Sequence, residues 1–324
     1  MASETELKSL YETRLKEKLS ALESSRKRIL KRSILTVLML AVLGAEIYLL
    51  VNINPHVALI VACMVISVAF PIYFIYHTVK QKKQYRENFK SGVVAEVVKL
   101  FNPDWQYLYD YCMSQESYQQ SGLFPHHYDR YTGDDFVTGK IEKTDFQFSE
   151  LHTQYKQVTY NSKGQRQEHW VTIFRGLFMH ADFNKNFLGT TYVLPDTAER
   201  LLGSFGQSLQ KMSSRGQLVK LENPEFEKRF VVYSSDQVES RYILTPSIME
   251  SIVNISNRFE GDVYFSFVGS RIYYANSINK ALFEPNIFRS GVNFNDMKEM
   301  FDLFEMITVL VQELNLNTRI WTKK

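Results

Sequence analysis

Two apolar runs separated by five residues constrain this chain more than any other feature of its sequence. Residues 34–51 contain one charged residue, Glu46, and residues 57–76 contain none. As helices that rise 1.5 Å per residue, the runs would be about 27 and 30 Å long, close to the roughly 30 Å thickness of a bilayer's hydrocarbon core. We therefore expect a two-helix transmembrane hairpin over residues 33–78.

A secretory signal peptide is the competing interpretation of the first run. Its apolar region would be shorter, would start nearer the first residue and would end at a small-residue cleavage site. In this chain 33 residues precede the run, and the second run follows almost at once. The pattern favours two membrane spans.

Basic residues flank the two runs on their outer sides and are missing between them. Residues 52–56 contain no Lys or Arg, whereas residues 1–32 and 79–100 each carry a net charge of +4. Lys and Arg are retained on the cytoplasmic side of membrane spans. We expect a multi-pass protein with two spans and both termini in the cytoplasm.

The two basic flanks also read as helices beside the membrane. Residues 1–32 form an amphipathic pattern in which Leu7, Tyr11 and Leu15 recur at spacings of four. Residues 79–100 are expected to form a basic juxtamembrane helix. The apolar stripe of the first helix fits self-association and packing onto residues 79–100 equally well.

Glu46 is the one carboxylate within the apolar runs. An ionisable residue inside a membrane is a candidate proton or ion site by default. Glu46 lies only six residues before the linker at 52–56. This position favours a side chain that reaches the membrane surface.

Residues 101–324 have the pattern of a soluble, largely antiparallel α+β domain, which the topology places in the cytoplasm. Short aromatic and β-branched runs predict eight strands: 136–141, 146–160, 170–181, 190–193, 217–221, 230–233, 263–268 and 271–275. Helices are predicted at 105–119, at 196–212 from a capping-box pattern, at 245–257 behind Thr245-Pro246, and at 295–314. Strands and helices without regular alternation favour an α+β fold.

Charge and motifs exclude several classes of function for this domain. Its net charge is −4, which argues against a nucleic-acid partner, because such partners require a basic surface. The two cysteines, Cys63 and Cys112, belong to no CxxC or Cys/His pattern, so no metal site is predicted. Gly-rich phosphate loops and the common hydrolase and kinase signatures are also missing from the sequence, so we expect neither a cofactor nor a recognisable set of catalytic residues.

One polar set is nevertheless a candidate site. Its members are embedded in apolar, strand-like stretches, where a polar side chain needs a reason to be present. They are Arg175, Asp182, Asp236, Glu239 and Arg241. Convergence of these side chains in one pocket would favour an enzyme or a ligand-binding site.

Two ordered stretches carry a resemblance to a known family. They are IFRGLF at 173–178 and LENPEFEKRF at 221–230, the latter followed by ESRYILTP at 239–246. Together with the preceding apolar pair, they resemble an uncharacterised family of bacterial membrane proteins that is sometimes labelled galanin-like. The resemblance implies a bacterial inner-membrane location and transfers no activity.

Two functions are compatible with these patterns. The first is a membrane-anchored binding or scaffolding module that holds a soluble domain at the cytoplasmic face of the membrane. Its expected partner is the lipid bilayer, with another membrane protein or a second copy of the chain as further candidates. The alternative is a membrane-proximal enzyme with an unrecognised site.

Overall fold

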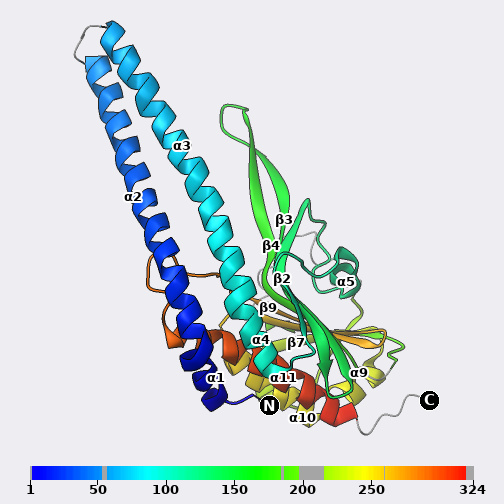
Figure 1. Cartoon of the computed structure of the whole chain (residues 1–324). Helices are drawn as coiled ribbons and strands as arrows, with labels where there is room; N and C mark the ends of the chain where they lie inside the picture. Colours follow the sequence, from blue (N-terminus) through cyan, green and yellow to red (C-terminus); the bar gives the residue numbers. More distant parts are fainter. Residues whose placement is uncertain (1, 53–56, 184–185, 197–214, 259, 319–324) are drawn as a thin grey trace. The chain divides into compact units, whose positions relative to one another are not determined.

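The computed structural model describes residues 2–52, 57–183, 186–196, 215–258 and 260–318 (Figure 1). Within these ranges, the side chains of residues 50–66 and 313–318 are not described. The chain forms two compact units. Unit 1 contains residues 1–100 and 283–301, and unit 2 contains residues 101–282 and 302–324.

Unit 1 is helical. Its elements are α1 (Glu4–Leu10), the π-helical turn η1 (Tyr11–Leu15), α2 (Lys16–Asn52), α3 (Val57–Phe89), a second π-helical turn η2 (Lys90–Val94), α4 (Ala95–Phe101) and the start of α11 (Phe294–Thr318). A capping box begins α1: the Glu6 N–H donates to Ser3 Oγ, and the Ser3 N–H donates to the Glu6 carboxylate. This arrangement satisfies two of the free N–H groups at the helix start.

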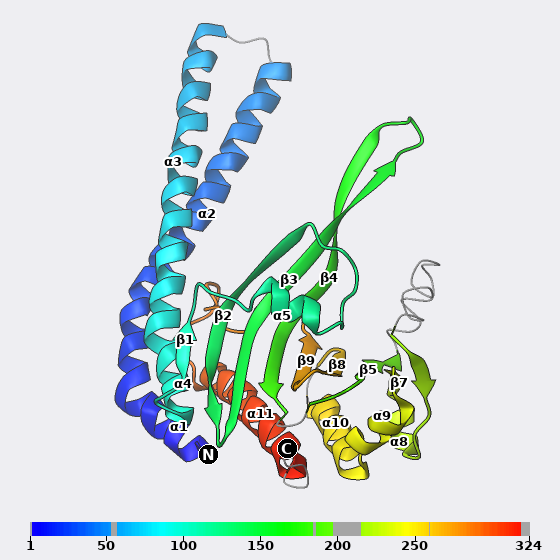
Figure 2. The ribbon, with the colours of Figure 1, turned by 90° about the vertical axis from the view of Figure 1, so that its right-hand side faces the viewer.

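The helices α2 and α3 lie side by side as an antiparallel pair (Figures 1 and 2). Among the described residues, one helix is long and apolar enough to cross a membrane, Glu4–Leu49. Of the two expected spans, the described residues therefore show one candidate, the helix that contains the first apolar run. Half of the second apolar run falls on residues 57–66, whose side chains lie outside the described part of the chain.

The apolar stripe of the N-terminal helix is buried within unit 1. Leu7, Leu15 and Leu19 are buried, and the Tyr11 ring packs edge-on against Phe294 at 5.4 Å. Around the stripe, Lys18 Nζ lies 3.1 Å from a carboxylate oxygen of Glu96 in α4 and donates to the Gly92 carbonyl. The stripe thus packs on the chain itself, which leaves little of it for self-association.

Unit 2 is built on one antiparallel sheet of nine strands in the order β1-β2-β3-β4-β9-β8-β5-β7-β6. The strands are β1 (Gln106–Leu108), β2 (Arg130–Ile141), β3 (Thr144–Tyr160), β4 (Arg166–Asp182), β5 (Thr190–Pro195), β6 (Gln217–Val219), β7 (Phe230–Ser234), β8 (Val263–Val268) and β9 (Arg271–Ser277). Every neighbouring pair is antiparallel. The α+β class with an antiparallel sheet is therefore confirmed.

The helices of unit 2 are short, apart from α10 (Pro246–Arg258) and the C-terminal part of α11. They include α5 (Gln115–Gln120), α8 (Pro224–Glu227) and α9 (Gln237–Ile243). Figure 1 shows α10 and α11 on one side of the sheet and α5 on the other.

All eight predicted strands correspond to observed ones, but the predicted helix at 105–119 is wrong. That segment contains β1 and the short α5 instead. Trp105 explains the difference: its indole N–H donates to the Lys140 carbonyl, and its ring packs on Phe146, so the segment is held to the sheet. The predicted helix at 196–212 falls almost entirely on residues 197–214, outside the described residues.

An aromatic core fills the face of the sheet covered by α5. Phe178 is fully buried there, with Tyr118, Phe174 and Tyr273 around its ring at centroid distances of 5.3 to 6.3 Å. The opposite face buries Phe148 against Phe304 of α11 at 5.8 Å. These side chains come from alternating strand positions, since successive strand residues point to opposite faces.

Gly176 marks a close approach of β4 to the end of β9. Its φ is +146°, and a Cβ atom there would lie 2.0 Å from the Asn276 carbonyl oxygen. We expect Gly176→Ala to destabilise unit 2 by about 3 kcal/mol, because both the backbone conformation and the contact are unfavourable for a side chain. Equilibrium unfolding in urea measures the change.

Gly164 provides the matched control for that substitution. Its φ is also positive, +73°, but a Cβ atom there would meet nothing within 4 Å. Gly164→Ala should reduce the unfolding free energy by only about 1 kcal/mol, because the positive φ is unfavourable for alanine but no atom lies close to its Cβ. Equal losses in the two variants would contradict the close approach at Gly176.

Candidate functional site

The surface of the helical pair is apolar over the stretch that the sequence assigns to the membrane. Val37 is 66% exposed and Tyr76 is 65% exposed, and many of their neighbours are similarly open. Only 6% of the most apolar window of Glu4–Leu49 is buried, whereas the core helix of a soluble protein is mostly buried. An apolar surface of this extent requires an apolar environment.

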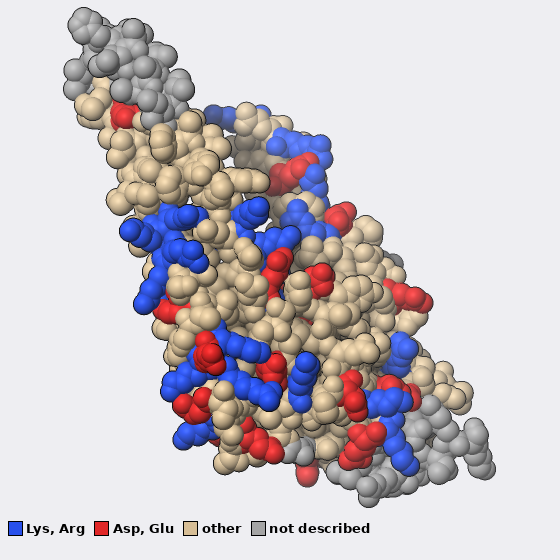
Figure 3. Space-filling model, viewed as in Figure 1, with Lys and Arg blue, Asp and Glu red and all other residues tan. Residues whose placement is uncertain are grey.

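A basic collar borders this apolar surface on one side. Figure 3 shows a band of Lys and Arg side chains on the helical pair, with largely uncharged surface above it and further charged side chains of both signs below it. The collar consists of Lys27, Arg28, Lys31 and Arg32 on α2 and Lys80, Lys82, Lys83 and Arg86 on α3. Both helices thus carry positive charge at the same level, where anionic headgroups would lie.

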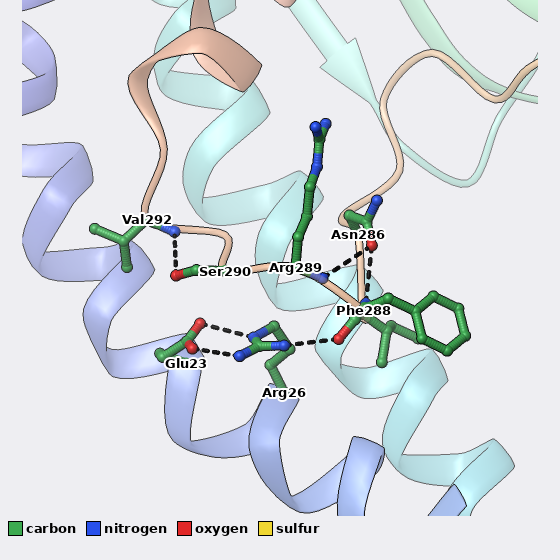
Figure 4. A network of polar contacts seen from close by, with 8 residues as sticks. Glu23, Arg26, Asn286, Phe288, Arg289, Ser290 and Val292 are labelled. Atoms are coloured by element: carbon green, nitrogen blue, oxygen red, sulfur yellow. Dashed lines mark hydrogen bonds and ion pairs between the residues drawn. The ribbon is translucent and has the colours of Figure 1, made fainter. Parts of the chain in front are cut away.

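A loop from Asn286 to Val292, here called the strap, is fastened to α2 below the collar. Arg26 Nη1 donates to the Ile287 carbonyl at 2.8 Å, and the same guanidinium holds the Glu23 carboxylate with hydrogen bonds of 2.6 and 2.9 Å (Figure 4). The hydrogen bonds from Arg26 hold the pKa of Glu23 below its usual range. Phe288 is 83% exposed, and its ring points away from the ion pair.

A cavity of about 250 Å³ opens between α2 and α3 beside the collar. Its lining is mainly polar and comes from both helices: Ser25, Arg28, Ile29, Gln81, Gln84, Tyr85 and Asn88. Arg28 Nη2 donates to Ser25 Oγ at 3.2 Å. Gln81 Oε1 is buried and has no hydrogen-bond partner within the described part of the chain.

Polar side chains continue along the interface between α2 and α3 toward the membrane stretch. Ser67 Oγ donates to Glu46 Oε1 at 2.9 Å, so Glu46 faces α3 instead of the membrane surface. Ser33 Oγ and Thr78 Oγ1 are buried, with no hydrogen-bond partner among the described residues. Sequence reasoning missed this seam, although its polar residues recur at helical spacing within otherwise apolar helices.

The five residues of the predicted polar set are distributed over two regions of unit 2. Arg175 lies on β4 opposite His152, and Asp182 ends β4 opposite Arg271. Seven residues of strand separate Arg175 from Asp182 by roughly 23 Å. Three strands lie between β4 and β7, which precedes α9, so Arg175 is also remote from the other three residues.

The other three members of that set lie together at α9 (Gln237–Ile243) and contact the backbone. Asp236 is the N-cap of α9 and accepts hydrogen bonds from the N–H groups of Val238 and Glu239. The Glu239 carboxylate accepts from the N–H groups of Leu188 and Gly189, at 3.1 and 2.8 Å. Arg241 is exposed, and its guanidinium is 3.5 Å from the Gln237 carbonyl. These contacts give each side chain a local structural role.

Arg215 is a buried cation that the sequence did not reveal. It is 6% exposed, and its Nη2 donates to the carbonyls of Gly122 and Leu123. Its guanidinium lies 5.4 Å from the centre of the Tyr192 ring, and Nε has no partner among the described residues. Burial lowers the pKa of Arg215. The side chain fastens the 122–123 turn over the aromatic core.

His180 is a buried histidine on β4 whose pKa is lowered to about 4 by burial and, secondarily, by Arg271. Because the folded state binds this proton less readily than the unfolded chain, its contribution to stability is complete above about pH 6.5. We expect this contribution, about 3 kcal/mol, to be lost as the pH falls from 6.5 to 4. Unfolding free energies of the wild type and His180→Leu, measured across this range, should therefore diverge from each other by that amount. Parallel pH profiles would contradict the buried, neutral state of His180.

One family model matches the chain, over a segment that lies mostly in unit 2. A family described as proteins of unknown function, DUF3137, matches residues 172–316. This segment contains both quoted stretches, at 173–178 and 221–230, and the match supports the resemblance to an uncharacterised family without supporting its membrane location or its galanin-like label. No curated protein matches the chain.

Among solved structures, the chain is similar to the crystal structure of the mycobacterial trehalose monomycolate transport factor A, TtfA. The TM-score is 0.30 and the sequence identity is 10%, over 67% of this chain and 93% of that chain.

Proposed function

We propose that the chain is a membrane-anchored binding or scaffolding module of the bacterial inner membrane. In this proposal α2 and α3 both cross the bilayer, the linker at 52–56 lies outside, and both termini and unit 2 lie in the cytoplasm. The observation that carries the proposal is the exposed apolar surface of the helical pair, bordered on one side by the basic collar.

The position of the collar supports the cytoplasmic assignment. Collar residues occur on both helices, before the first apolar run and after the second, and the linker carries none. A signal peptide would not account for this symmetry, because its basic residues precede a single apolar region. The hydrogen bond from Ser67 on α3 to Glu46 on α2 also favours two spans packed against each other, because lipid chains could not supply hydrogen-bond partners for these side chains.

Binding is favoured over catalysis because the five candidate polar residues of unit 2 do not meet in one site. Asp236 and Glu239 are occupied by backbone N–H groups, and Arg175 lies several strands away. A general acid–base pair or an activated nucleophile requires neighbouring groups within hydrogen-bond reach. Unit 2 instead offers a broad sheet with a long β3–β4 hairpin (Figure 2), a surface suited to contacts with a protein partner.

Alkaline carbonate extraction of bacterial membranes tests the anchor. The wild type should stay in the membrane pellet, and the double variant L40K/V42K should be released, because each Lys near the centre of a span costs about 2.5 to 3.5 kcal/mol. The control V238K/Y242K places the same charges on exposed apolar positions of α9 and should remain in the pellet. Release of the wild type by carbonate would overturn the proposal.

Chemical crosslinking in intact cells, before detergent extraction, tests the scaffolding part. A single dominant partner should be recovered with the wild type and lost with L40K/V42K. Recovery of the same partner with the released variant would show that the membrane anchor does not serve this interaction.

A further inference from the structure

The cavity between α2 and α3 has the chemistry and the position of a lipid headgroup site. Its volume of about 250 Å³ is far above the roughly 10–15 Å³ that holds one water molecule. Arg28 is its one charged lining residue, and the remaining polar lining consists of a hydroxyl, three side-chain amides and the Tyr85 phenol. Such a lining can hold one anionic group and several hydrogen-bonding groups at once.

The end of the cavity nearest the apolar runs lies close to the headgroup layer of a membrane. Arg28 lies six residues before the apolar run that starts at Ile34, and Gln81 lies five residues after Tyr76, distances of about 9 and 7.5 Å along the helices. The headgroup layer on each side of a bilayer is roughly 5–8 Å thick. A lipid whose chains lie against the apolar surface would therefore bring its phosphate to the level of Arg28.

The charges around the cavity also fit an anionic lipid. Collar lysines flank the lining residues along both helices, although Lys83 is paired with Glu87 at 3.9 Å. The nearby Glu23 carboxylate is neutralised by Arg26. Gln81 Oε1 is buried and has no hydrogen-bond partner among the described residues, so a ligand in the cavity could donate a hydrogen bond to it. A phosphate alone supplies acceptors, whereas a ligand that also carries a donor such as a hydroxyl group would satisfy Gln81 Oε1.

We propose that this cavity binds the headgroup of an anionic phospholipid that bears hydroxyl groups, of the phosphatidylglycerol class. Arg28 holds the phosphodiester, and Gln81 with its amide neighbour Gln84 holds the glycerol hydroxyls. The inference rests on the proposed membrane anchor and deepens it, because it gives the anchor a preferred lipid.

Native mass spectrometry of the full chain, released from nanodiscs, tests the proposal. In nanodiscs of phosphatidylcholine with phosphatidylglycerol, the wild type should retain one phosphatidylglycerol in preference to phosphatidylcholine. The double variant R28Q/Q81L should lose this preference about tenfold, and R28K should recover part of it. The control K82Q removes an exposed collar charge that does not line the cavity, and its effect should be less than twofold.

Each other outcome has a defined meaning. Equal losses for K82Q and R28Q/Q81L would overturn the site and leave only the general attraction of a basic surface. Equal retention of phosphatidylmethanol, an anionic phosphodiester whose headgroup carries no hydrogen-bond donor, would overturn the role of Gln81. Displacement of all bound lipid by millimolar glycerol phosphate would assign the cavity to a soluble phosphate instead.

The membrane anchor is checked separately on the same variants. R28Q/Q81L should resist carbonate extraction as the wild type does, because both substitutions lie outside the apolar runs. A carbonate-resistant wild type without lipid preference would overturn the headgroup site alone, whereas a wild type released by carbonate would overturn the proposed anchor.

Discussion

Replacing Phe178 with alanine should reduce the unfolding free energy of unit 2 by about 3 to 5 kcal/mol. The side chain is fully buried on β4, where Tyr118, Phe174 and Tyr273 surround its ring. The loss combines the transfer free energy of a benzyl group with the cavity left between rigid aromatic neighbours. This is a large fraction of the 5–15 kcal/mol that stabilises a typical domain.

Urea unfolding followed by tryptophan fluorescence measures this loss. All three tryptophans lie in residues 101–324, so the signal reports on the segment that contains the sheet. Tyr160→Ala provides the control, because Tyr160 is 70% exposed at the end of β3 and its removal should change stability by less than about 0.5 kcal/mol. A loss below 1 kcal/mol for Phe178→Ala would contradict the aromatic core described above.

Replacing Arg26 with methionine should release the strap from α2. The substitution leaves the half-buried Glu23 carboxylate without its guanidinium partner and the Ile287 carbonyl without its donor. Removal of one partner from a buried ion pair costs about 3 to 5 kcal/mol. If that cost appears as local opening of the strap, the open population should rise by about two to three and a half orders of magnitude.

Limited trypsin digestion of the full chain in detergent measures this opening through cleavage after Arg289, which lies in the strap. The double variant E23M/R26M should be cut more slowly than R26M, because it removes both charges and leaves none buried alone. Lys16→Met breaks the exposed Lys16–Glu12 pair and should leave the rate near that of the wild type. Unchanged cleavage of R26M would show that Arg26 does not fasten the strap.

Much of the sheet could be predicted from the sequence because its strands combine alternation with clear turn residues. The segment 263–275 is an example: VYFSFV, Gly269-Ser270 and RIYYA predict the β8–β9 hairpin, and Gly269 adopts the positive φ that such a turn requires. β1 could not be predicted, because its three residues acquire their conformation from pairing with β2.

The site was harder to predict than the fold for a physical reason. The polar set of unit 2 was chosen by the local contrast between charged and apolar neighbours, and this contrast also marks residues such as Glu239 that satisfy backbone N–H groups. The collar could be predicted because it depends on local sequence. The cavity required knowing that Arg28 and Gln81, more than 50 residues apart, lie on facing helices.

Cysteine labelling tests whether the helical pair crosses the membrane with both of its ends on the cytoplasmic side. With Cys63 and Cys112 replaced by alanine, single cysteines are placed at Asn54 in the linker and at Ser162 in the β3–β4 turn. A membrane-impermeant maleimide should label N54C in intact spheroplasts and should label S162C only after permeabilisation. Labelling of S162C in intact spheroplasts would show that unit 2 lies outside the cytoplasm. Labelling of N54C only after permeabilisation would show that the linker does not cross to the outer side.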